Sequence, residues 1–400
     1  MDIEAENIRK NVEAKFGAMV VCCILGVGQL VAWNTILTIS DYYYQVFPEY
    51  HPSRVLTLVY QPFVLGTICI IVFMGKTNKN QIRIMIGYTI FFFGTLLLII
   101  LDLVTKGAGG FSAYMVLCSI VACFGIANAH VEGAMVGELS FMCPEFIQSF
   151  VVGLGIAGAI TSALRLLTKA LFDKSPNGLR KGALLFLVFS TLIEFICIVL
   201  YLYIFPKLPV VKYYYAKAES IHRETEEKKT SRLSNKELLY QNKDLAVNLF
   251  LIYALTLSIF PGFLYENTGK HKLGSWYALV LVASYNGWDA FSRYIPLIEH
   301  LKLKSAKWIT ACVLMRFLFV PAFYFTAKNA DQGWMISLTS FLGLTNGYLT
   351  ACVMAFTPKS NYNALETNAL GNLLVAFMLG GVFAGVCLGW LWLIGTNSSF

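Results

Sequence analysis

The stretch Tyr285-Asn286-Gly287-Trp288-Asp289-Ala290-Phe291-Ser292-Arg293-Tyr294 places an acid and a base four residues apart inside an apolar segment. Four residues is just over one helical turn, so Asp289 and Arg293 lie on the same helix face and can pair. Asn286, three residues before Asp289, widens this polar stripe. Charges at membrane depth are costly and usually face a protein interior or a watered cavity, so the stripe predicts a substrate or ion pathway. The alternative is a buried ion pair that only locks this helix to its neighbours.

The composition around this stripe is that of a polytopic membrane protein. The chain has 400 residues, of which 57% are hydrophobic and 14% charged, and its mean hydropathy is +0.63. A spanning helix needs about 20 mostly apolar residues. We therefore predict an all-α fold with eleven transmembrane helices. The apolar segments cover residues 17–40, 55–75, 82–103, 112–140, 146–172, 182–205, 245–265, 275–297, 305–327, 333–356 and 368–394.

Hydrophilic stretches divide these segments into two groups. The longest stretch predicts an N-terminal bundle of six helices (17–205), a central loop (206–244) and a C-terminal bundle of five (245–394). This division is typical of transporters that bind substrate between two halves. Lys and Arg are most frequent in the central loop, and the positive-inside rule then predicts a cytosolic tail at 1–16 and an extracytosolic tail at 395–400. No organelle address stands out, so we expect the plasma membrane, with the vacuolar membrane as the alternative.

The sequence lacks the patterns of several other classes. It has no Walker-type phosphate loop, no His-Glu-x-x-His helix and no Gly-x-Ser-x-Gly elbow, so we expect neither an ATP-driven pump nor an enzyme. The ten cysteines include no pair with metal-type spacing, and we expect free thiols, no metal site and no cofactor. The formal net charge of +8 fits cytosolic loops beside a lipid bilayer with anionic headgroups and gives no sign of a nucleic-acid partner.

A second polar stripe lies in the fourth apolar segment. Asn128 and Glu132 are one turn apart and share a helix face. A membrane-embedded Glu can be a substrate ligand, a proton carrier or a hydrogen-bonded acid kept neutral by burial, and the sequence leaves all three open. We expect Arg165, in the fifth segment, to pair with Glu132 or Glu138. Arg316 is a further intramembrane cation with no acid nearby in sequence, so we interpret both arginines as structural or gating charges.

Several residues together resemble a known family, the equilibrative nucleoside transporters. The similarity runs over nearly the whole chain, and the stretches at 50–57 and 144–150 look like the plant branch of that family. Its most specific marks, in chain order, are Trp33-Asn34, Phe260-Pro261, the stripe of Asn286, Asp289 and Arg293, Arg316 with Val320-Pro321, and Asn346-Gly347-Tyr348.

The resemblance implies a major-facilitator-like arrangement of six plus five helices. It also implies that the protein carries purine and pyrimidine nucleosides, such as adenosine and uridine, by alternating access. In this family, aromatic and apolar side chains line the site, a polar residue of helix four contacts the base, and the acid and base of helix eight meet the ribose. The substrate-binding residues implied for this chain are Leu30, Trp33, Glu132, Phe260, Asn286, Asp289 and Arg293.

Two positions depart from the family pattern. Ala32 stands where many members have Pro, so the resemblance does not predict whether helix one bends at this position. Glu132 stands where many members have Gln, and an ionised Glu accepts hydrogen bonds but cannot donate them. Glu132 is therefore also the proton-coupling candidate, and transport is expected to be facilitative or proton-coupled. The alternative function is a major-facilitator-like carrier of another small polar solute.

Overall fold

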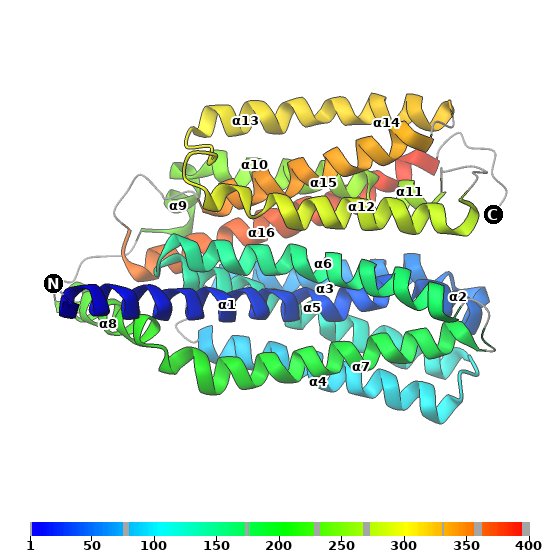
Figure 1. The fold of residues 1–400 in the computed structure, drawn as a ribbon, viewed down its shortest axis with the longest axis horizontal. Coiled ribbons are helices and arrows are strands. Elements are labelled where there is room, and N and C mark those ends of the chain that lie inside the picture. Colours follow the sequence, from blue (N-terminus) through cyan, green and yellow to red (C-terminus); the bar gives the residue numbers. More distant parts are fainter. Residues whose placement is uncertain are drawn as a thin grey trace.

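The described part of the chain is helical throughout (Figure 1). The structure, a computed structural model, describes residues 2–74, 80–172, 175, 177–227, 233–266, 273–329, 332–355 and 362–393. Long apolar runs form helices because a helix satisfies its own backbone hydrogen bonds where water is absent. The expected tail at 395–400 lies outside the described residues.

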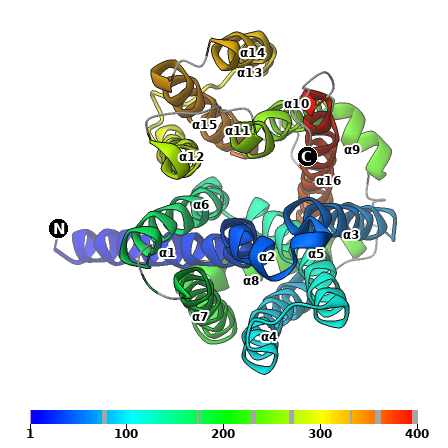
Figure 2. The same ribbon diagram turned by 90° about the vertical axis from the view of Figure 1, so that its right-hand side faces the viewer.

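The long helices form two groups that lie side by side (Figure 2). Where the groups meet, α6 packs against α12, and α16 packs against α3 and α5. The N-terminal group contains α1 (Asp2–Thr38), α3 (Pro52–Met74), α4 (Asn80–Thr105), α5 (Phe111–Ser140), α6 (Pro144–Phe172) and α7 (Gly178–Val199). The C-terminal group contains α10 (Lys243–Ile259), α12 (Tyr277–Ser292), α13 (Ala306–Met315), α14 (Phe319–Lys328), α15 (Gln332–Met354) and α16 (Ala364–Gly389).

Shorter helices lie at the two ends of the molecule (Figure 1). The central stretch expected as a loop contains α8 (Pro209–Glu227) and α9 (Asn235–Gln241), and α9 begins with a capping box between Ser234 and Glu237. The opposite end carries α2 (Ser40–Val46) and α11 (Gly262–Glu266). Single turns complete the chain: η1 (Pro48–Tyr50), η2 (Leu200–Ile204), η3 (Phe205–Lys207), η4 (Gly274–Trp276), η5 (Ile295–Leu297), η6 (Arg316–Leu318) and η7 (Trp390–Leu393).

Among the described residues, ten helices are long and apolar enough to cross a membrane. They overlap ten of the eleven expected segments. The exception is the segment at 275–297, where the continuous helix α12 covers only 16 residues. The chain then turns through Ile295–Leu297, where Pro296 lacks the backbone N–H that a continuing α-helix would use.

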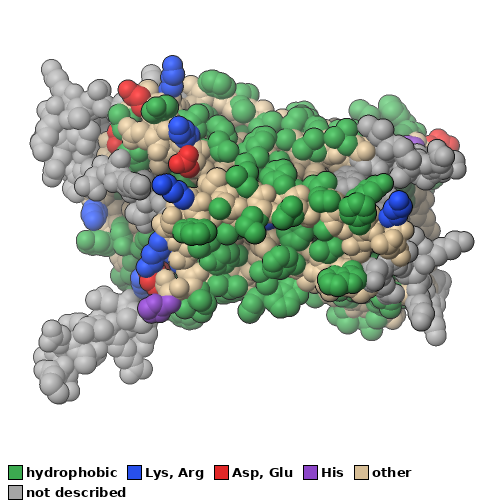
Figure 3. Space-filling view, turned by 90° about the horizontal axis from the view of Figure 1, so that it is seen from above, with side chains coloured by type: hydrophobic (Ala, Val, Ile, Leu, Met, Phe, Trp, Pro, Cys, Tyr) green, Lys and Arg blue, Asp and Glu red, His purple; other side chains and the backbone are tan. Residues whose placement is uncertain are grey.

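The surface separates apolar from charged side chains along the length of the molecule. In Figure 3, hydrophobic side chains cover the middle of the visible face, most of the visible charged side chains gather at its left end, and a few lie at its right end. Large exposed apolar residues such as Phe93, Leu192, Leu314 and Phe341 lie on different helices around the bundle. This distribution fits a surface that meets lipid in the middle and water at both ends.

Candidate functional site

Asp289 and Arg293 form the ion pair that their spacing predicts. Arg293 Nε donates to Asp289 Oδ2 at 2.9 Å, and both residues are 5% exposed. Asn346 Nδ2 donates to the second carboxylate oxygen at 2.8 Å. Arg293 also donates, through Nη1, to the backbone carbonyl of Val151 on α6 at 2.9 Å. Arg293 therefore contacts both groups of helices, and the polar stripe lies where the groups meet.

Arg316 is bound by neutral groups. Its Nε donates to Thr345 Oγ1 at 3.1 Å, its Nη1 to the carbonyl of Ile252 at 3.2 Å, and its Nη2 to Thr256 Oγ1 at 2.7 Å. Thr256 in turn lies 2.8 Å from Asn346 Oδ1, on the same amide that binds the Asp289 carboxylate. A continuous polar network thus joins Arg316 to the buried pair across four helices of the C-terminal group.

Glu132 is held by two amides in the N-terminal group. Its Oε2 accepts from Asn128 Nδ2 at 3.2 Å and from Gln29 Nε2 at 3.3 Å, and Gln29 also donates to Asn128 Oδ1 at 2.5 Å. The bond between Asn128 and Glu132 follows from their four-residue spacing. The role of Gln29, on α1, was missed in the sequence; its only signal there is an amide within an apolar helix.

The expected pairing of Arg165 with Glu132 or Glu138 is wrong. Arg165, on α6, forms its ion pair with Asp41 on α2. Glu138 instead accepts from two phenols, Tyr201 OH at 3.1 Å and Tyr215 OH on α8. The physical reason is depth, because Asp41 lies at the same end of the molecule as Arg165, whereas Glu138 lies at the opposite end of the neighbouring helix.

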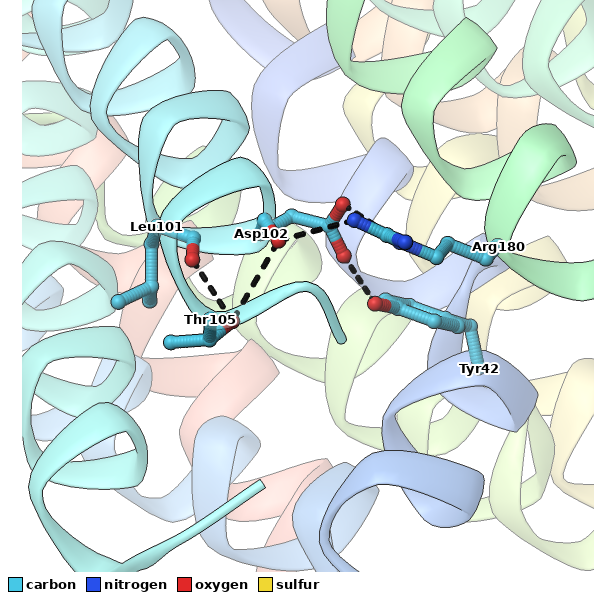
Figure 4. Close-up of polar contacts among 5 residues, drawn as sticks. All are labelled: Tyr42, Leu101, Asp102, Thr105 and Arg180. Atoms are coloured by element: carbon cyan, nitrogen blue, oxygen red, sulfur yellow. Dashed lines mark hydrogen bonds and ion pairs between the residues drawn. The ribbon is translucent and has the colours of Figure 1, made fainter. Parts of the chain in front are cut away.

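A second contact fixes α2 to the same end of the N-terminal group. Asp102 at the end of α4 accepts from the Tyr42 phenol and, at 2.9 Å, from Arg180 Nε at the start of α7 (Figure 4). Burial raises the pKa of Tyr42, and its hydrogen bond to Asp102 raises it further. The phenol therefore stays protonated at neutral pH and acts as the donor.

We expect Arg180→Gln to lower the thermal unfolding temperature of the detergent-purified protein by several degrees. The change leaves the Asp102 carboxylate, whose side chain is 8% exposed, without its cation. The Tyr42 phenol still donates to this carboxylate, but the lost hydrogen bond to a charged group contributes about 1.5–3 kcal/mol. The matched control is Lys304→Gln, because Lys304 and Glu299 are 65% and 68% exposed and such pairs contribute little. Equal melting curves for the two variants would contradict the expectation.

Two predicted aromatic residues are each stacked on a tyrosine. Trp33 and Tyr60 have ring centroids 3.8 Å apart and an interplanar angle of 6°. Phe260 and Tyr285 have centroids 3.9 Å apart and an angle of 20°. Phe260 directly follows the end of α10, and the Phe260–Pro261 peptide bond is cis.

A cavity of about 330 Å³ lies between the two groups at the α2 end of the molecule. Among the described lining residues every side chain is uncharged. The N-terminal group contributes Asn34, Leu37, Thr38, Ser40, Tyr44, Thr57, Leu58 and Thr161; the C-terminal group contributes Leu257, Ser258, Phe260, Pro261, Gly262, Phe263, Val282, Asn286, Val386, Gly389 and Trp390.

The predicted site residues divide into two levels. Phe260 and Asn286 line the cavity, and Asn286 Nδ2 donates across the groups to Ser162 Oγ at 2.7 Å. The other five are not among the lining residues. Trp33 and Asp289 lie about one helical turn deeper than the lining residues Leu37 and Asn286, toward the α8 end. This deeper set comprises Leu30, which is half-buried, and the buried Trp33, Glu132, Asp289 and Arg293.

The two groups close against each other at the α8 end. A Cβ atom added to Gly371 on α16 would lie 3.0 Å from the Cα atom of Gly137 on α5, so the helices cross where neither has a side chain. Beside this crossing, Asn80 Nδ2 donates to Asn368 Oδ1 at 3.0 Å, and an Nη atom of Arg83 donates to Asn372 Oδ1 at 3.1 Å. The interface is therefore closed at one end and hollowed at the other.

Two helical bundles with apolar outer surfaces, buried charges where they meet and a cavity open toward one end define a membrane transporter. Comparison with known proteins supports this class. A family model described as Nucleoside transporter matches residues 117–394. The chain is 59% identical to Equilibrative nucleotide transporter 3 of Arabidopsis thaliana, with 98% of each chain covered. It is 31% identical to Equilibrative nucleotide transporter 1 of the same plant, covering 94% of this chain and 86% of that one.

The chain belongs to the nucleoside transporter family and is an integral multi-pass membrane protein. The predicted resemblance, including the plant branch, is confirmed, as is the expectation of a carrier rather than an enzyme. Among solved structures, the major facilitator proton:xylose symporter XylE shares the fold with a TM-score of 0.67 at 11% identity, covering 97% of this chain and 90% of that one. A bacterial homologue of the iron transporter ferroportin matches with a TM-score of 0.55 at 14% identity, covering 93% and 92%.

Proposed function

We propose that this transporter carries purine and pyrimidine nucleosides by alternating access, either facilitatively or coupled to protons. The observation that carries the proposal is the uncharged, partly aromatic cavity, which lies next to the buried Asp289–Arg293 pair on its α2 side. A nucleoside is neutral, with a flat base that can stack on aromatic rings and ribose hydroxyls that can donate to a carboxylate and accept from a guanidinium. A volume of about 330 Å³ falls at the small end of the range for ligand pockets, about 300–1,000 Å³.

Two further observations support alternating access. The cavity is open at the α2 end, and the Gly137–Gly371 crossing and the amides on α4 and α16 join the groups at the α8 end. A carrier that rocks its halves around a midplane site needs such a closure on one side at a time. The conformation described therefore corresponds to one of the two states of the cycle.

We propose eleven membrane spans in a six-plus-five arrangement. The eleventh span is α12, which is too short to be among the ten helices long enough to cross a membrane. It runs alongside α6 and α15 between the two ends of the bundle (Figure 1). The basic residues of the central stretch support a cytosolic location for the α8 end. In this orientation the cavity opens away from the cytosol. We propose bundles at 17–205 and 245–394, joined by the cytosolic stretch 206–244. We further propose the plasma membrane as the site of action.

Uptake of radiolabelled adenosine and uridine by nucleoside-transport-deficient cells tests the proposal. We expect saturable uptake of both nucleosides, with each competing against the other and neither sugars nor amino acids competing. Protein at the cell surface is measured in parallel. Competition by a sugar instead, with no nucleoside uptake by correctly localised protein, would favour a carrier of another small polar solute.

Glu132→Gln tests proton coupling separately from substrate identity. The substitution keeps the size of the side chain and removes its ionisable proton, and it restores the donor that many family members have at this position. We expect uptake to persist. The uptake rate at acidic pH divided by the rate at neutral pH should approach one. The control is Glu138→Gln, a buried acid held by two phenols away from the cavity, which should keep the wild-type ratio. Unchanged transport and unchanged pH dependence in Glu132→Gln would end the coupling hypothesis.

A further inference from the structure

Each half of the transporter contains the same aromatic unit at the central interface. In each group, the first two long membrane helices are joined by a face-to-face ring pair, Trp33 with Tyr60 between α1 and α3, and Phe260 with Tyr285 between the end of α10 and α12. The centroid separations of 3.8 and 3.9 Å are shorter than the range of about 4.5–7 Å common for aromatic pairs, so the rings overlap directly. No residue-level repeat in the sequence indicates this equivalence.

Each unit also lies near a buried acid. Tyr285 lies one turn before Asp289 on α12, and Trp33, the ring stacked on Tyr60, lies one turn along α1 from Gln29, which binds Glu132. Tyr60 is 3% exposed and Tyr285 is 6% exposed. Neither lines the cavity, whereas Phe260 does. Tyr285 thus lies behind a ring that lines the cavity, and Tyr60 covers one face of Trp33 in the deeper set of predicted site residues.

We propose that Tyr60 and Tyr285 are positioning residues that fix the orientation of Trp33 and Phe260, so that each half presents one tyrosine-backed aromatic face to a flat heteroaromatic base. This inference rests on the proposed nucleoside transport. A ring whose one face is covered by a tyrosine offers only its other face for stacking. Removing the tyrosine frees the ring to change rotamer, and the substrate must then restrict that motion when it binds.

The consequence is a specific effect on substrate affinity. Tyr60→Leu and Tyr285→Leu should each raise the KM for adenosine by about three- to tenfold, the range expected for loss of an aromatic pair. The maximal rate per transporter at the surface should stay near the wild-type value. Uridine should be affected less than adenosine, because a pyrimidine ring offers a smaller stacking area.

The test measures adenosine and uridine uptake kinetics for these variants, with surface protein quantified. Tyr60→Phe and Tyr285→Phe keep the stacked ring and should restore the wild-type KM. Phe91→Leu removes a fully buried ring that packs against Phe124, with centroids 5.6 Å apart, and should leave KM unchanged. Tyr60→Met, which fills space without a ring, should reproduce the KM rise if Tyr60→Leu does not reach the membrane.

The outcomes separate the inference from the function on which it rests. Wild-type uptake with an unchanged KM in the Leu and Met variants would overturn the positioning role alone. A KM rise in the Phe variants as large as in the Leu variants would overturn it as well, because the hydroxyl rather than the ring would then carry the effect. No nucleoside uptake by well-expressed wild-type protein would overturn the proposed function first.

Discussion

Asp289→Asn and Arg293→Ala are each expected to reduce nucleoside uptake by at least about 30-fold, because truncating one partner of a buried charge pair costs about 2–5 kcal/mol. Arg293→Ala leaves the Asp289 carboxylate with Asn346 as its remaining amide donor, and it also removes the bond to the Val151 carbonyl. Initial uptake rates of adenosine and uridine, normalised to surface protein, measure the effect. Glu299→Gln, an acid 68% exposed in the same half, is the control and should transport normally.

The double variant Asp289→Asn with Arg293→Gln separates a substrate-binding pair from one that only locks helices. The double variant contains no unpaired buried charge. If the pair is purely structural, thermal stability and uptake should therefore recover together. A pair that binds ribose should recover stability only. Full uptake by the double variant would therefore contradict the binding role of both residues.

Gly371→Ala is expected to lower the maximal uptake rate by about tenfold. Overpacking costs roughly 1–3 kcal/mol, and here it destabilises the state that is closed at the α8 end. The added Cβ atom would lie 3.0 Å from the Cα and 3.1 Å from the backbone N of Gly137. Backbone atoms cannot move aside without separating α5 from α16, so the closure at the α8 end should be weakened. Uptake rates over a range of adenosine concentrations measure the change.

Gly380→Ala on the same helix is the matched control. A Cβ atom there would meet only the ring of Phe250, at 3.7 Å, which is an ordinary contact. Both substitutions favour the helix equally, so any difference between them reports on the crossing of α5 and α16. Equal rates for the two variants would show that this crossing does not limit transport.

Features that depend on one helix were predicted correctly from the sequence. The ten long spans follow from the length of the apolar runs, because in lipid the backbone N–H and C=O groups can hydrogen-bond only to one another. The Asp289–Arg293 bond and the Asn128–Glu132 bond follow from four-residue spacing.

Features that join different helices were decided only by the tertiary structure. The periodicity of a segment gives the face on which a residue lies, but it does not give the rotation and depth of that helix relative to its neighbours. The sequence therefore suggested two glutamates as partners of Arg165, whereas in the structure Arg165 pairs with Asp41, which lies at the same depth. For the same reason, Gln29 beside Glu132 and the tyrosines behind Trp33 and Phe260 emerged only when the helices were packed together. The sequence by itself determined which charges enter the membrane, and the packing of the two halves determined which partners stabilise them there.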